Sequence, residues 1–247
     1  MKTYFTSDFH LGSSNIINYC KRPFKNVSHM NDTLIRRVNK LDRHDVLFHV
    51  GDFVLVGHDR HGIKEDFSDI KYSEYLDKIK PHIILLNGNH DSGHNVKAML
   101  TSAVVNLNRK YKNISVSHFP LTHENYKSYS NKIHIHLCGH VHDKWLMFFD
   151  VKAGILNYNV GVDCHNYNLV KDSQIIEDLD FIFTYHDFNQ SWKMTVQNMI
   201  ELKTKIKVKL NNDREKRKQE RYHKKGLTEA ECLRRKEEAL RKKGILK

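Results

Sequence analysis

Side chains that can bind a metal ion occur in five short clusters. In chain order these are Asp8-Phe9-His10, Gly51-Asp52, Gly88-Asn89-His90-Asp91, His118 and Gly139-His140-Val141-His142. Neutral imidazole, carboxylate and amide oxygen suit divalent metals such as Mn, Fe, Zn or Ni. Asp-x-His and His-x-His each place two donors on one short loop, so separate segments can share one ion. Each cluster alone is common by chance, but all five together indicate a metal site.

Short β-prone or apolar runs of strand length precede several of these clusters, and helix-like segments separate the runs. The strand-like runs are Lys2–Ser7, Asp45–Val50 and His82–Leu86, and the helix-like segments are Asn31–Leu41 and Phe67–Ile79. Loops that follow strands can bring polar groups together over one edge of a sheet. The alternation of strand and helix predicts stacked strands covered by helices.

Further along the chain, short β-prone runs are joined by turns, a pattern that predicts β-hairpins. These runs are Asn113–Ser117, Lys132–Cys138, Trp145–Phe149 and Leu156–Val160. The composition shifts after about Ile176. We therefore predict a catalytic domain over residues 1–176 and a basic, mainly helical C-terminal extension over residues 177–247.

Apolar residues of the extension fit one helical stripe, namely Trp192, Val196, Met199, Ile206 and Leu210. The segment 202–210 also alternates with a period of two, as a strand would. Helix is favoured because Glu, Lys, Arg and Gln dominate the residues that follow. Thr228 and Glu231 have the spacing of a helix capping box.

The positive charge of the chain is concentrated in its last residues. The formal net charge is +12, and residues 201–247 hold 18 Lys and Arg against 8 Asp and Glu, a balance of +10. Residues 1–200 hold the other 23 and 21, a balance of +2. A basic tail favours a polyanionic partner such as nucleic acid. A solvated helix that keeps the protein in solution is an equal alternative.

The five clusters resemble the calcineurin-like metallophosphoesterase superfamily, whose pattern is D-x-H, GD, GNH[DE], H and GHxH. The similarity covers roughly residues 1–175. The stretches Ser7–Phe24 and Asn159–Val170 also resemble the small single-domain members of bacteria and phages. The resemblance implies an α/β (α+β) fold, a two-sheet β-sandwich flanked by helices. It places the site where the carboxyl ends of strands converge.

The resemblance also implies two divalent metal ions at one site, with manganese favoured. The implied ligands are Asp8, His10 and His142 for the first ion, Asn89, His118 and His140 for the second, and Asp52 bridging both. His90 would act on the substrate, with Asp91 orienting its ring. An imidazole whose pKa is near 6.5 can give a proton to a leaving alkoxide when a carboxylate fixes its orientation.

These residues together predict hydrolysis of phosphoester bonds by a metal-bridging hydroxide. The basic tail favours a nucleotide or nucleic acid phosphodiester as substrate. One alternative is a phosphomonoesterase acting on a small molecule, and another is a catalytically silent binding scaffold, which usually loses metal ligands. Large phosphoprotein phosphatases of the superfamily carry GDxxDRG, whereas here Asp59 and Arg60 are displaced, so phosphoprotein specificity is not supported.

Three further basic residues could contact substrate phosphate, or could be exposed and solvated: Arg22, His58 and Arg60. Of the histidines outside the five clusters, His123 and His134 are candidates to lie behind the ligands. No apolar run approaches the roughly 18 residues of a membrane span. The four cysteines form no CxxC motif. We therefore expect a cytoplasmic protein with reduced thiols, no cleaved signal and no membrane partner.

Overall fold

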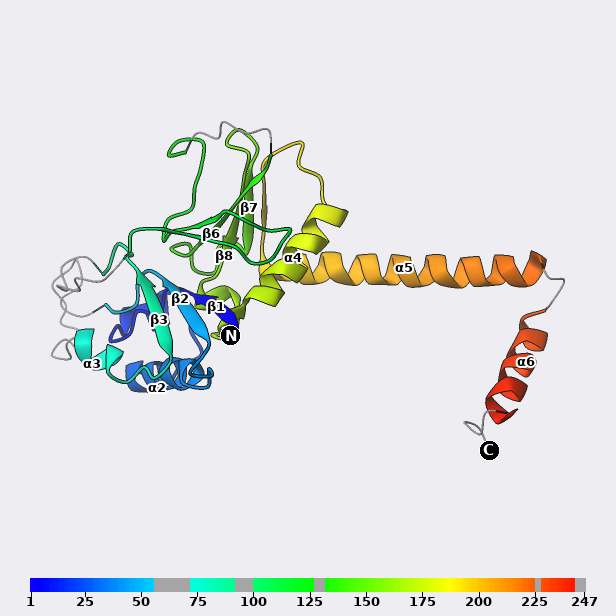
Figure 1. The fold of residues 1–247 in the computed structure, drawn as a ribbon, viewed down its shortest axis with the longest axis horizontal. Helices are drawn as coiled ribbons and strands as arrows, with labels where there is room; N and C mark the ends of the chain where they lie inside the picture. The colour runs from blue at the N-terminus through cyan, green and yellow to red at the C-terminus, as the bar shows by residue number, and fades with distance from the viewer. Residues whose placement is uncertain (56–71, 92–99, 127–131, 225–227, 243–247) are drawn as a thin grey trace. The chain divides into compact units, whose positions relative to one another are not determined.

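The computed structural model describes residues 1–55, 72–91, 100–126, 132–224 and 228–242 (Figure 1). The chain divides into two compact units, Met1–Val196 and Gln197–Lys247. The first unit holds two mixed sheets flanked by helices, as the sequence predicts. The predicted domain boundary after residue 176 stays a prediction, and the first compact unit continues beyond it to Val196.

The first sheet has the strand order β3-β2-β1-β9. Its strands are β1 (Thr3–Thr6), β2 (Val46–Val50), β3 (His82–Leu86) and β9 (Val170–Lys171). β1, β2 and β3 run parallel, with Thr6 opposite His49 and Val50 opposite Leu86. Their carboxyl ends therefore meet at one edge of the sheet. The three strand-like runs predicted in this half are confirmed, because continuous apolar runs suit strands buried on both faces.

The second sheet has the order β10-β7-β8-β6-β5-β4. Its strands are β4 (Ala103–Val105), β5 (Ile114–Val116), β6 (His134–Cys138), β7 (Met147–Asp150), β8 (Ile155–Asn159) and β10 (Trp192–Met194). Among the predicted runs, only β7 and β8 pair as a hairpin, whereas β5, β6 and β8 are parallel. A β-prone run predicts a strand but not its neighbour. The long connection from β5 to β6 allows a parallel crossover.

Helices cover the sheets and bury apolar stripes against them (Figure 1). They are α1 (Asn15–Tyr19), α2 (Val27–Val38), α3 (Tyr72–Leu76), η1 (Val162–Cys164) and α4 (Asp172–Tyr185). α2 begins four residues before the predicted segment, because the Asn26 side chain caps it by accepting from the His29 amide. Met30 and Leu34 of α2 join Leu47 of β2 in the core. For the segment predicted at 67–79, the described helix is α3.

The second unit contains α6 (Glu229–Lys242) and most of α5 (Val196–Lys224), which confirms helix rather than strand for residues 202–210. Trp192 was placed on the same stripe, but it lies in β10 and pairs with Phe149 of β7. Pairing with the edge of β7 therefore decides the conformation of Trp192, although its spacing from the other apolar residues fits a helix. Thr228 and Glu231 form the predicted capping box. Among the described residues, no helix has the length and apolar character needed to cross a bilayer.

Candidate metal centre

The predicted ligands lie in loops that follow the carboxyl ends of parallel strands. Asp8 and Asp52 follow β1 and β2, and His118 and His140 follow β5 and β6. Backbone hydrogen bonds join these loops, because the Asp8 amide donates to Gly51 O and the Gly139 amide donates to His118 O. Segments far apart in the sequence therefore converge at one place between the two sheets.

A first group brings together Asp8, His10 and His142, each offering one ligand atom within 4.8 Å of the others. Asp8 is fully buried and His10 is 2% exposed. Neither ring nitrogen of His10 has a hydrogen-bond partner among the described residues. A buried polar group without a partner is costly, and a cation would satisfy it. Burial also holds the pKa of His10 well below its ordinary value, so the ring stays neutral, as a ligand must.

A second group brings together Asp52, His118 and His140, again within 4.8 Å. Asn89 joins it, because its Oδ1 lies 3.0 Å from His118 Nε2 and 3.0 Å from His140 Nδ1. His118 Nδ1 donates to the carbonyl of Val50 at 2.9 Å, which turns the other ring nitrogen, Nε2, toward the group. The carboxylate, amide oxygen and imidazole nitrogens gathered here form a donor set that fits a divalent ion.

Asp52 lies between the two groups. Its Oδ2 is 3.2 Å from His118 Nε2 and 3.5 Å from His10 Nε2, and the residue is 1% exposed. Burial by itself would raise the pKa of Asp52, but the hydrogen bond from His118 and the proximity of His10 lower the pKa below its usual value. An ionised carboxylate thus faces both groups.

The backbone is strained at the ligands. Among the described residues, nine other than glycine have a positive φ. Five of the nine are predicted ligands, namely Asp8 (60°), His10 (51°), Asp52 (55°), His140 (70°) and His142 (50°). This region of φ costs about 1–3 kcal/mol for such residues and is concentrated at functional sites. The surrounding fold therefore holds these loops in a shape that local preference opposes.

Two motif glycines are required by close approach to the carboxylates. A Cβ atom on Gly88 would lie 2.2 Å from Asp52 Oδ1, and one on Gly139 would lie 2.5 Å from Asp8 Oδ2. Real Cβ atoms do not come so close to other heavy atoms. The glycines of the Gly-Asn-His and Gly-His-x-His motifs thus make room for ligands that other motifs contribute.

His90 lies beside the two groups, and its ring centroid is 5.2 Å from that of His10. Its backbone amide donates to Asp52 Oδ1 at 2.9 Å. The prediction that Asp91 orients the His90 ring is wrong for this structure. The Asp91 carboxylate instead accepts from the amides of Asp52 (2.6 Å), Gly88 (2.9 Å) and Phe53 (3.0 Å). Asp91 is 3% exposed, and these buried amides need an acceptor, so it fastens two ligand loops together.

Sequence reasoning did not single out Asp163, which supports His142 from behind. His142 Nδ1 donates to Asp163 Oδ2 at 2.9 Å. Arg22 holds the same carboxylate with two bonds of 2.8 Å and also donates to the carbonyls of Asp8 and Phe9. Arg22 is 4% exposed, so neither a substrate contact nor a solvated surface position fits it. It is part of the frame beneath the first group.

Other predicted positions lie elsewhere. His58 and Arg60 are outside the described residues. His123 Nδ1 donates to Asp150 at 2.8 Å, and His134 Nε2 forms a hydrogen bond with the Ser115 hydroxyl in the second sheet. Neither ring therefore lies behind a predicted metal ligand. Cys20, by contrast, was predicted only as a free thiol, and it lies with His142 and Asp163 in a third group of possible ligand atoms.

Comparison with known proteins gives limited likenesses. No family model matches this chain. An uncharacterized protein from Methanocaldococcus jannaschii is 38% identical over 91 residues, which are 36% of this chain. The chain matches 47% of that relative's length, about half. A protein of unknown function from Aquifex aeolicus has a TM-score of 0.48 at 22% identity, covering 71% of this chain and 98% of that one. Nuclease MPE from Pseudomonas putida has a TM-score of 0.37 at 17% identity, covering 64% and 78%.

Asp163 could have been found from the sequence. It lies inside Asn159–Val170, a stretch that the sequence analysis singled out but in which no residue was assigned a role. A metal-binding histidine usually donates its second ring N–H to a carboxylate or carbonyl. A search for an acid able to serve His142 would have pointed to this stretch.

Proposed function

We propose that this chain is a calcineurin-like metallophosphoesterase that hydrolyses phosphodiester bonds in a nucleotide or nucleic acid. The observation that carries the proposal is the position of Asp52, between two groups that each combine acid or amide oxygen with imidazole. Asp8, His10 and His142 would hold one divalent ion and Asn89, His118 and His140 the other, with Asp52 shared. Manganese is the favoured metal, because hard oxygen and borderline nitrogen donors are mixed.

Bound divalent ions would polarise phosphoryl oxygens and activate water for in-line attack. The protein's own residues supply the rest of the chemistry. His90 would give a proton to the leaving oxygen, and the hydrogen bond from its backbone amide to Asp52 supports its loop. Asp91 and the Arg22–Asp163 pair hold the ligand loops, so little reorganisation is needed during reaction.

The basic residues 201–247 support a polyanionic substrate. A panel of substrates with added manganese tests this choice: a bis-aryl phosphodiester, an aryl monoester, cyclic nucleotides, and single- and double-stranded DNA and RNA. Turnover of the diester and of nucleic acid is expected. Turnover of the monoester alone would instead indicate a small-molecule phosphomonoesterase, and no turnover with bound metal would indicate a silent scaffold.

The site itself is tested by Asp52→Asn. We expect loss of hydrolysis and a lower metal content, because the shared carboxylate loses its charge, while the far-ultraviolet circular dichroism stays unchanged. Asp42→Asn is the matched control, since Asp42 is an exposed acid away from the site. Full metal occupancy with near-normal turnover in the Asp52 variant would refute the assignment.

A further inference from the structure

An open pocket of about 950 Å³ lies at the opposite end of the second sheet from the metal centre. Its lining comes from residues just before β5 and at the start of β6, together with α4, whereas the site residues follow the ends of β5 and β6. β6 has five residues, so the two places are separated by roughly 16 Å of strand. The volume is within the range of about 300–1,000 Å³ that is usual for small-molecule sites.

The lining is basic. Its described residues include Lys110, Lys112 and Lys132 and no Asp or Glu. Asp180 of α4 lies close by and pairs with Lys110, and Tyr111 also donates to that carboxylate at 2.8 Å. Among these residues, three lysines against the Asp180 carboxylate leave a positive balance. A pocket with this charge favours an anionic ligand.

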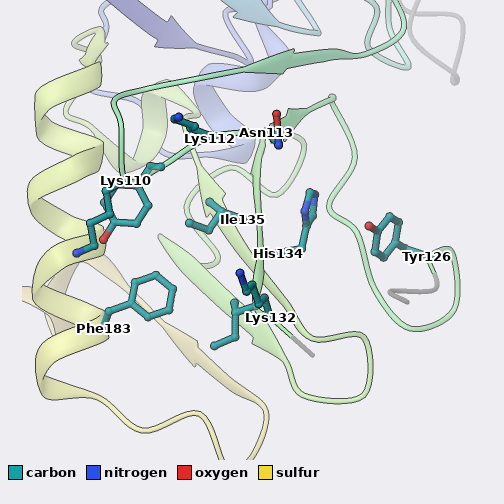
Figure 2. A pocket seen from close by; sticks show the side chains of 10 residues that line it. Lys110, Lys112, Asn113, Tyr126, Lys132, His134, Ile135 and Phe183 are labelled. Atoms are coloured by element: carbon teal, nitrogen blue, oxygen red, sulfur yellow. The ribbon is translucent and has the colours of Figure 1, made fainter. Parts of the chain in front are cut away.

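The same lining offers flat aromatic surfaces. Tyr126 and His134 stack with ring centroids 5.5 Å apart and planes 17° apart. The Ser115 hydroxyl lies 2.7 Å from His134 Nε2 and fixes that ring on the sheet. Phe183 is 36% exposed, although it stacks on Tyr111. Figure 2 shows Lys132 between the Tyr126–His134 pair and Phe183. Lysines interleaved with aromatic rings are the combination that binds phosphate and base together.

We propose that this pocket binds a nucleotide unit, with lysines holding its phosphate and an aromatic ring stacking on its base. The unit is either a free mononucleotide or one residue of a single-stranded nucleic acid. The pocket would be a second binding place, separate from the metal centre and independent of hydrolysis there.

Binding is tested with the full-length chain in EDTA, so that hydrolysis plays no part. Fluorescence anisotropy would follow a labelled oligothymidylate over a series of salt concentrations, with AMP as competitor. In Lys112→Ala/Lys132→Ala we expect weaker binding and a salt slope smaller by about 1.4, since each single-strand phosphate contact contributes about 0.7. In Tyr126→Leu we expect binding weaker by about tenfold with an unchanged slope, because stacking is lost rather than charge.

Lys40→Ala/Lys80→Ala is the matched control, because it removes two exposed lysines elsewhere. If AMP competes with the oligonucleotide, the ligand is a mononucleotide. If the oligonucleotide binds and AMP does not compete, the ligand is a single-stranded nucleic acid. Binding and slope equal to the control in the Lys112/Lys132 variant, at an unchanged melting temperature, would overturn the proposal. The Lys112→Ala/Lys132→Ala variant should hydrolyse the bis-aryl diester as fast as the wild-type protein. That assay separates failure of the pocket from failure of the catalytic proposal.

Discussion

His142 has a hydrogen-bonding partner that no motif contains. Burial by itself would lower the pKa of His142, but the hydrogen bond to Asp163 raises it to about 10. Arg22 in turn donates to both carboxylate oxygens of Asp163, through Nε to Oδ1 and through Nη2 to Oδ2. Planar pairing of this kind fixes orientation as well as charge. The ring of a proposed ligand is therefore oriented by two residues that lie behind the site.

We expect Asp163→Asn to weaken metal binding by about 10–100-fold, the usual effect of losing such a supporting carboxylate. Calorimetric titration with Mn²⁺ measures it. Asp143→Asn is the control, because this exposed acid lies one residue from His142 and removes the same charge. Equal affinities in the two variants would show that the Asp163 contact does not position the ligand.

His90 is proposed to act on the leaving group rather than on the metals. In His90→Ala the backbone amide that donates to Asp52 remains, so the ligand loop should persist. We expect both metals to be retained and turnover to fall by about 10²–10⁴, with a smaller loss for substrates that have a good leaving group. His82→Ala at an exposed position serves as control. Loss of metal from the His90 variant would make His90 a ligand instead.

At the scale of elements, the loops after β2 and β3 are packed so closely that side chains of one occupy the space beside the other's backbone. A Cβ on Gly88 would meet the Asp52 amide nitrogen at 2.3 Å as well as its carboxylate. Asp91 fastens the same two loops through three or more backbone amides. The strand ends thus form one rigid unit rather than independent loops.

Gly88→Ala should therefore displace Asp52 and lower both metal content and turnover. Gly154→Ala is an informative contrast, because nothing lies within 4 Å of its Cβ position and only its φ of +64° opposes a side chain. That change should cost about 1 kcal/mol of stability and leave turnover unchanged. Metal analysis and thermal unfolding of both variants measure the difference. Normal metal content in Gly88→Ala would mean that the loops can relax.

At the scale of the whole molecule, charge and chemistry are on different units. The predicted ligands all belong to Met1–Val196, and the balance of +10 belongs to residues beyond it. α5 and α6 carry most of these basic residues. Nucleic-acid affinity and hydrolysis of a small substrate should therefore respond differently to loss of the second unit.

Removal of residues 201–247 should leave hydrolysis of a small chromogenic diester intact, because none of the predicted ligands lies there. Affinity for nucleic acid should fall, and the salt slope should flatten by about 0.9 for each lost duplex contact and about 0.7 for each single-strand contact. Thermal melting monitors whether the shortened chain stays folded. Unchanged melting temperature, affinity and salt slope would mean that the tail only keeps the protein in solution.

Local patterns in the sequence determined the strands, their order along the chain and the residues that follow them. The run before Asp52 is a strand because four of the five residues in Val46–Val50 are apolar and suit a buried sheet, and Gly51 ends it. Thr228 and Glu231 were predictable for the same reason, since their contact spans a single helical turn. The metal-binding clusters were recognisable because each is only a few residues long.

Only the tertiary structure decided the contacts between distant segments. Arg22 and Asp163 are 141 residues apart, and nothing local shows that one buries its charge on the other. Asp91 accepts from the backbone amides of Asp52 and Phe53 and does not orient the His90 ring, because these buried amides need an acceptor. Trp192 was predicted on a helical stripe, but it lies in a strand that pairs with β7. In each case the residue's partner belongs to a distant segment of the chain. Packing of the fold brings the two together, and the spacing of residues along the sequence does not reveal it.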